Sequence, residues 1–161
     1  ALIRYQLAVR EPSPLDLLKT YLDPAIIGVL GLMSFVMIAY VVERIIYLAR
    51  VDVRQFEQPE TLDIALTRHL TIIATIGANA PYVGLLGTVL GILITFYDIG
   101  QGGSIETGAV MLGLALALKA TALGLLVAIP SIIFYNALLR RVEVLTARWR
   151  ASRAGPRSEW P

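Results

Sequence analysis

The chain has 161 residues, of which 57% are hydrophobic and 16% are charged, against about 45–50% and about 25% in ordinary globular domains. Its mean hydropathy is +0.70 per residue. These values exclude an ordinary soluble domain, and the absence of cysteine excludes a disulfide framework and a thiolate metal site. The net charge of +2 does not indicate a nucleic-acid-binding protein, because the basic residues flank the apolar runs.

Three apolar stretches dominate the chain. Residues 24–42 and 70–97 contain no Asp, Glu, Lys or Arg, and residues 107–139 contain a single charged residue, Lys119. Each stretch reaches the roughly 18–20 residues needed to cross a hydrocarbon core about 30 Å thick. The sequence therefore predicts an all-α polytopic membrane protein with three transmembrane helices. No cleavage-site pattern precedes the first run, so we expect no signal peptide.

The segments follow from the apolar runs and the residues that interrupt them. In chain order we predict an N-terminal periplasmic or interfacial segment at 1–23, transmembrane helix 1 at 24–50, a cytoplasmic linker and helix at 51–80, transmembrane helix 2 at 81–99, a periplasmic turn at 100–106, transmembrane helix 3 at 107–140 and a cytoplasmic tail at 141–161. The second and third helices are expected to extend into the cytoplasm, because a run of about 35 residues is roughly 50 Å long. Pro130 should bend the third helix without ending it. The sequence leaves open whether 77–81 breaks or kinks a long helix.

The basic residues predict the orientation. Four lie between the first and second apolar runs and six follow the third run, which together make ten of the fourteen Lys and Arg residues. The turn at 98–106 has two acids and no base. Basic residues in short loops stay on the cytoplasmic side. We therefore expect a periplasmic N-terminus and a cytoplasmic C-terminus.

Small residues mark one face of the second and third spans. Gly84, Gly87 and Gly91 recur at helical spacing on the second, and Gly124 belongs to a similar stripe on the third. Small residues let membrane helices approach closely, and a lone stripe of this kind indicates tight packing only. Each stripe also carries a central hydroxyl, from Thr88 and Thr121. Two such helices suggest an assembly that encloses a narrow space.

Lys119 lies some dozen residues into the third span. An ionisable residue at such depth is a candidate for function and needs a partner. It is separated from Thr121 by about 200° around the helix, so the two side chains should face different neighbours. Candidate partners are helix-end carbonyls, a nearby Thr or Asn, or a carboxylate such as Asp98 of a neighbouring copy. His69 has no partner at metal-ligand spacing and is interpreted as structural or surface-exposed.

Two long motifs resemble the ExbB/TolQ/MotA energiser family. Residues 79–91, NAPYVGLLGTVLG, resemble its second-helix signature, and residues 115–130, ALALKATALGLLVAIP, resemble its third-helix signature. Glu43-Arg44 after the first span also matches. The resemblance covers about residues 28–141 and is greatest for the short ExbB members. One departure is Leu116, which stands where many relatives carry a glutamate.

The resemblance implies a function and a set of partners. ExbB-like subunits form a homopentamer around ExbD-like single-span proteins with an intramembrane Asp, and convert proton motive force into motion of a TonB-like protein. The matching residues Thr88 and Thr121 would line the inner space. We therefore expect a motor subunit of the bacterial inner membrane that energises outer-membrane transport, without cofactor or metal. The alternatives are a TolQ-like envelope-integrity energiser and a passive membrane scaffold. No catalytic constellation is present, so we expect no enzyme.

Overall fold

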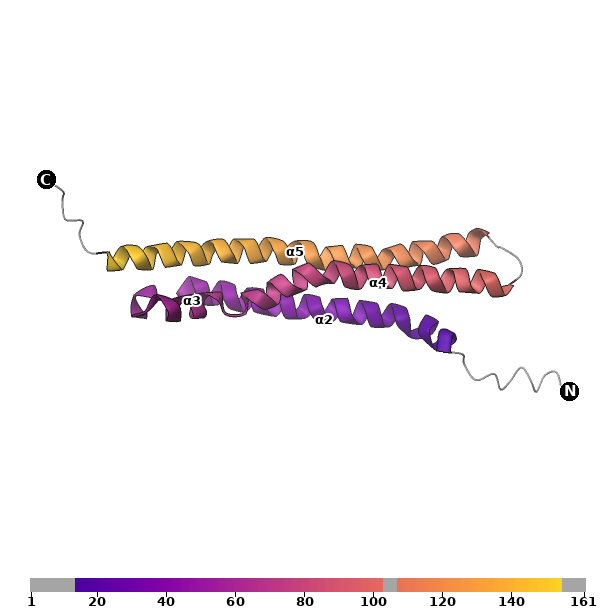
Figure 1. Ribbon diagram of the computed structural model, residues 1–161, viewed down its shortest axis with the longest axis horizontal. Helices are drawn as coiled ribbons and strands as arrows, with labels where there is room; N and C mark the ends of the chain where they lie inside the picture. The colour runs from indigo at the N-terminus through magenta and orange to yellow at the C-terminus, as the bar shows by residue number, and fades with distance from the viewer. Residues whose placement is uncertain (1–13, 103–106, 155–161) are drawn as a thin grey trace. The chain divides into compact units, whose positions relative to one another are not determined.

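The chain is almost entirely helical in the part that the computed structural model describes, residues 14–102 and 107–154. The elements are α2 (Pro14–Arg50), the short 3-10 helix η1 (Val53–Gln55), α3 (Pro59–Thr67), α4 (Leu70–Gly102) and α5 (Thr107–Arg153) (Figure 1). These described residues include no strand, which confirms the all-α prediction. Three segments are long and apolar enough to span a membrane, as predicted: Thr20–Arg50, Leu70–Gly100 and Val110–Arg153.

Helix α4 passes through Pro81 without a break, which answers the question that the sequence left open. The interruption comes earlier, at the junction between α3 and α4. His69 adopts a left-handed conformation there, with φ of 65°, which is uncommon for a residue other than glycine but more frequent for His. The helix expected within 51–80 is thus two helices, and the second of them is continuous with the apolar span.

Helix α5 continues to Arg153, beyond the expected end of the third span at 140. The helix also passes through Pro130, which cannot donate a backbone hydrogen bond. The hydroxyl of the next residue, Ser131, donates to Val127 O at 2.8 Å. The extension past 140 buries Val142, Leu145 and Trp149. These residues recur at three- and four-residue spacing, so they share one face of the helix.

The described residues form two compact units, each built from several helices. The first unit lies within 1–32 and 80–126, and the second lies within 33–79 and 127–161. Helices α2, α4 and α5 contribute to both, while η1 and α3 belong to the second. The two units are held together internally by different kinds of contact.

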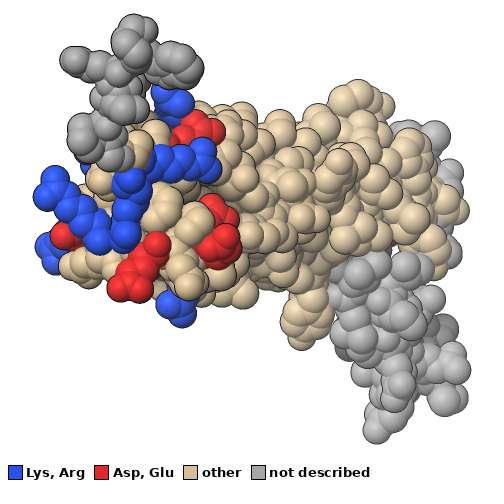
Figure 2. All heavy atoms as spheres, turned by 60° about the vertical axis from the view of Figure 1, so that its left-hand side comes forward, with Lys and Arg blue, Asp and Glu red and all other residues tan. Residues whose placement is uncertain are grey.

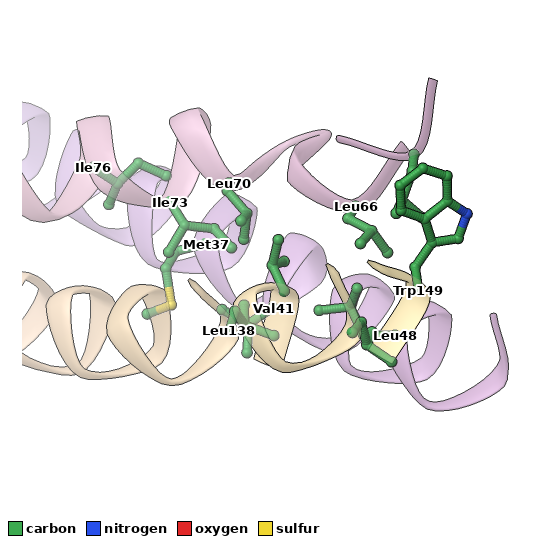
Figure 3. Close-up of a cluster of buried hydrophobic side chains, with 12 residues drawn as sticks. Met37, Val41, Leu48, Leu66, Leu70, Ile73, Ile76, Leu138 and Trp149 are labelled. Carbon is green, nitrogen blue, oxygen red and sulfur yellow. The ribbon is translucent and has the colours of Figure 1, made fainter. Parts of the chain in front are cut away.

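The second unit has a core of large apolar side chains (Figure 3). Its buried members come from all four α-helices: Met37, Val41, Leu48, Leu62, Leu66, Leu70, Ile73, Ile76, Leu138, Val142, Leu145 and Trp149. The indole Nε1 of Trp149 donates to Phe56 O at 2.9 Å, so the loop after η1 is fastened to α5. Most charged residues of the described chain also belong to this unit. On the face in Figure 2 the acidic and basic side chains are gathered together, and the adjoining surface is uncharged.

Removing Leu66 from this core should destabilise the protein. Its side chain is fully buried on α3, whereas Ile64, two residues away on the same helix, is 69% exposed. Leu66→Ala should lower the free energy of unfolding by about 2–5 kcal/mol because it leaves a cavity, and Ile64→Ala should change it little. Thermal unfolding of the purified protein in detergent measures both. Equal losses in the two variants would contradict the burial of α3 against this core.

Candidate functional site

Helices α4 and α5 approach each other at backbone distance in the first unit. A Cβ added at Gly84 would lie 2.7 Å from Ala120 O and 3.1 Å from Gly124 Cα. The contact is reciprocal, because a Cβ at Gly124 would lie 2.7 Å from Ala80 O and 3.0 Å from Gly84 Cα. No side chain fits between backbones this close. The predicted packing role of Gly84 and Gly124 is therefore supported by the geometry of the contact.

The same face of α4 continues with Gly87 and Gly91. A Cβ at Gly87 would meet the Cβ of Ala120 at 2.7 Å and Cγ2 of Ile26, on α2, at 3.2 Å. A Cβ at Gly91 would meet the Cβ of Ala117 at 2.9 Å. Gly91 thus lies against α5 alone, while Gly87 stands where all three helices meet.

This close contact brings the two predicted threonines together. Thr88 is buried and lies one turn after Gly84. Its Oγ1 lies 2.5 Å from Oγ1 of Thr121 and 3.0 Å from Ala117 O, with Gly84 O at 3.3 Å. The residue spacing within α4 or within α5 does not by itself predict that these two hydroxyls pair.

The bond directions in this pair are linked, because each hydroxyl has a single proton. A hydroxyl has one proton to donate, and a carbonyl can only accept. When Thr88 donates to the carbonyl of Ala117, the bond between the two hydroxyls must be donated by Thr121. A chain of donation then runs from Thr121 to Thr88 to Ala117 O. Both protons are used inside the chain, and Thr121 Oγ1 keeps a lone pair for a donor from outside.

Lys119 lies on a different side of α5 from Thr121, as the helical angle predicts. It is exposed on the surface of the chain and lines a small hollow together with Asp23 of α2. Asp23 is a residue of this hollow that sequence reasoning missed. The signal that could have found it is its position in the first turn of that span, where a carboxylate of α2 can face another helix.

Pro130 lies in the second unit, away from the threonine pair. Beside it, a Cβ added at Gly77 of α4 would meet Ser131 Cβ at 3.2 Å and Ile132 Cγ1 at 3.0 Å. Gly77 and Ser131 therefore make a second close contact between α4 and α5, and this one lies within the second unit. Pro130 does not line the hydroxyl site.

A buried arginine is the feature of the second unit that the sequence did not reveal. The guanidinium of Arg44, 2% exposed, makes two 2.6 Å hydrogen bonds to the carboxylate of Glu43 and donates to Ala65 O of α3 at 3.1 Å. His69 Nδ1 lies 3.4 Å from the same carboxylate, and its ring packs on Tyr40. His69 is thus structural, as interpreted, and the network joins α2 to the junction of α3 and α4. In the described residues no three His, Cys, Asp or Glu side chains are arranged to hold a metal ion.

Adding one methyl group at the backbone contact should disrupt the first unit. Gly84→Ala and Gly124→Ala each place a Cβ against a carbonyl oxygen and should cost about 1–3 kcal/mol through overpacking. Gly28→Ala and Gly31→Ala are matched controls, because nothing lies within 4 Å of a Cβ at either position. The measurement is thermal unfolding and the yield of assembled protein in detergent. A loss in the controls as large as at Gly84 would show that the contact itself is not the cause.

Comparisons with known proteins point to one family. A model of the MotA/TolQ/ExbB proton channel family matches residues 53–151. The chain is 50% identical over 134 residues to the "Biopolymer transport protein ExbB" of Helicobacter pylori strain J99, covering 83% of this chain and 92% of the relative. It is 53% identical over 134 residues to the protein of the same description from Aquifex aeolicus, covering 83% and 90%. A "Putative biopolymer transport protein ExbB-like 2" of Helicobacter pylori is 49% identical over 132 residues, covering 82% and 88%.

Proposed function

The chain belongs to the MotA/TolQ/ExbB proton channel family, and we propose that it is the subunit of an ExbB-type motor through which proton motive force energises transport across the outer membrane. In this proposal it assembles as a homopentamer around ExbD-like single-span helices that carry an intramembrane Asp. The motion produced is passed to a TonB-like protein. Thr88 and Thr121 face the space where the partner helices lie.

The observation that carries the proposal is the hydroxyl pair. Threonine hydroxyls do not ionise at physiological pH, so this pair can bind and orient a proton carrier but cannot itself be one. Leu116 occupies the position at which many family members have a glutamate. In this proposal the titrating group comes from another chain. A protonated carboxyl of a partner helix can donate to the free lone pair of Thr121, and the ionised carboxylate cannot.

The surface of the spans leaves room for such partners. In each of the three spans, only 17–22% of the most apolar 18-residue stretch is buried inside the chain. Exposed apolar side chains follow both helices of the site: Leu85, Leu86, Val89 and Leu93 on α4, and Leu116, Leu118, Leu125 and Leu126 on α5. In a membrane these faces can contact lipid, neighbouring copies and partner helices. A subunit whose spans are so incompletely covered is suited to an oligomer.

The hydroxyls should be needed for transport and not for assembly. Thr88→Val and Thr121→Val keep nearly the same volume and should cost only about 0.5–1.5 kcal/mol each, the value of one hydrogen bond. Energised uptake across the outer membrane should fall to that of cells lacking the chain. Complementation of such cells, with oligomer yield measured in parallel, gives both readouts. Thr95→Val is the matched control on α4, because the hydroxyl of Thr95 donates to Gly91 O of its own helix.

Other results would point to other functions. Normal uptake in both valine variants would show that the two threonines serve only in packing. If cells lacking the chain keep uptake but lose outer-membrane integrity, the TolQ-like role replaces the proposed one. A passive scaffold predicts that neither phenotype changes when the proton motive force is collapsed.

We also propose that the N-terminus lies in the periplasm of an inner-membrane protein and the C-terminus in the cytoplasm. Ten basic residues flank the inner ends of the spans in this orientation, as the distribution of positive charge requires. Because the chain has no cysteine, Gln101→Cys and Ser152→Cys each give a single reporter. An impermeant maleimide applied to intact cells should label position 101 only. Labelling of position 152 alone would reverse the orientation.

A further inference from the structure

We propose that Asp23 of α2 and Lys119 of α5 form an ion pair within one chain, bridged by a single water molecule. This pair fixes the first span against the third. This pairing does not depend on the proposed transport function. It assigns Asp23 and Lys119 a positioning role.

Both residues line a hollow of about 20 Å³ in the first unit. Its other walls are apolar and include Ile26, Gly87, Leu116 and Leu123. A space of roughly 10–15 Å³ accommodates one water molecule, provided that polar groups are present to bind it. An ammonium group only donates hydrogen bonds and a carboxylate only accepts them. One water can therefore accept from Lys119 and donate to Asp23.

The spacing along both helices directs these residues to the same place. Asp23, Ile26 and Ile27 stand at i, i+3 and i+4 on α2 and share one face. Leu116, Lys119, Ala120 and Leu123 stand at i, i+3, i+4 and i+7 and share one face of α5. Each face thus carries one charge among apolar neighbours, and the two charges have opposite sign.

Gly87 makes the approach possible. It lines the hollow, and a Cβ at this position would meet both Ile26 of α2 and Ala120 of α5. A larger residue would separate α2 from α5 and move Asp23 away from Lys119. The glycine on α4 therefore supports a contact between the other two helices.

The membrane makes the pair necessary. A charged side chain inside a span is costly and is almost always paired or directed to water. Lys119 is exposed on the chain's own surface, so it would meet lipid or a neighbouring subunit with its charge uncompensated. Asp23 lies in the first turn of its span and supplies the opposite charge from the same chain. A neighbouring copy is then not required as the partner.

Charge reversal tests the pairing in the full-length protein. Asp23→Lys and Lys119→Asp each place like charges at the hollow, and each should lower the melting temperature in detergent by on the order of 5 °C or more. The exchanged variant, Asp23→Lys with Lys119→Asp, restores opposite charges and should recover at least half of that loss. Asp63→Asn, which removes an exposed carboxylate of α3, controls for a change in charge alone. An exchanged variant as unstable as the sum of the single variants would overturn the proposal, because independent sites add.

Cross-linking gives an answer even if the charge variants fail to assemble. With no native cysteine in the chain, Asp23→Cys with Lys119→Cys should be joined within one chain by a short bis-maleimide and migrate as a monomer. A water-bridged pair holds the two Cα atoms too far apart for a direct disulfide. Asp23→Cys with Leu118→Cys is the control, since Leu118 is 62% exposed and lies outside the hollow. Cross-linked dimers, or the absence of an intrachain cross-link, would show that the partner of Lys119 is not Asp23 of its own chain.

Transport separates positioning from proton relay. The neutral variant Asp23→Asn with Lys119→Met removes both charges together and should still support uptake in proportion to the oligomer that assembles. Full assembly with complete loss of uptake would place the pair on the proton path and overturn the positioning role. Absence of energised uptake in the wild-type chain would instead count against the proposed function alone, because the stability and cross-linking results do not depend on it.

Discussion

The contact between the α4 and α5 backbones at Gly84 and Gly124 determines the geometry of the first unit. At this crossing each glycine would place a Cβ 2.7 Å from a carbonyl oxygen of the other helix. Since the backbones are this close, side chains one turn away meet their counterparts directly. Thr88 therefore reaches Thr121. The hydroxyl pair is a consequence of the crossing, and a wider crossing would separate it.

The two units are packed in different ways. The second has twelve large or medium apolar side chains in one buried cluster. Lipid tails are as apolar as leucine, so burial gives little driving force between membrane helices, and association depends on close packing and hydrogen bonds. The first unit has that second kind of contact at Gly84, Gly87 and Gly124. Small residues hold the helices of the first unit together, and large apolar residues hold those of the second.

A buried charge of the second unit is paired, and a second ion pair is proposed for the first unit. In the second unit, Arg44 is buried, with Nε and Nη2 donating to the carboxylate of Glu43 and Nη1 donating to Ala65 O. A buried arginine deprived of its partner is strongly destabilising, so this network holds the junction of α3 and α4 to α2. In the first unit, the pairing proposed for Asp23 and Lys119 has the same logic. Neither arrangement needs either charge to change.

The sequence by itself determined the helical class, the three spans and the small-residue faces, because these follow from local properties. Uninterrupted apolar runs specify spanning helices, and the three- and four-residue repeat shows which residues of one helix share a face. The same reasoning predicted that Lys119 and Thr121 have different neighbours. The continuation of α5 to Arg153 was not predicted, because charged residues interrupt the apolar pattern of Val142, Leu145 and Trp149. The burial of these three side chains is evident only in the cluster that they form with α3.

Only the tertiary structure decided which faces meet. The hydroxyl contact between Thr88 and Thr121, the hollow shared by Asp23 and Lys119, and the bond from Arg44 to Ala65 O each join residues that are at least 21 positions apart. Periodicity defines a face within one helix but carries no information about the rotation or the register of the next helix. That information resides in the crossing itself, where the absence of side chains at Gly84 and Gly124 permits one close approach and so selects the partners of every residue around it.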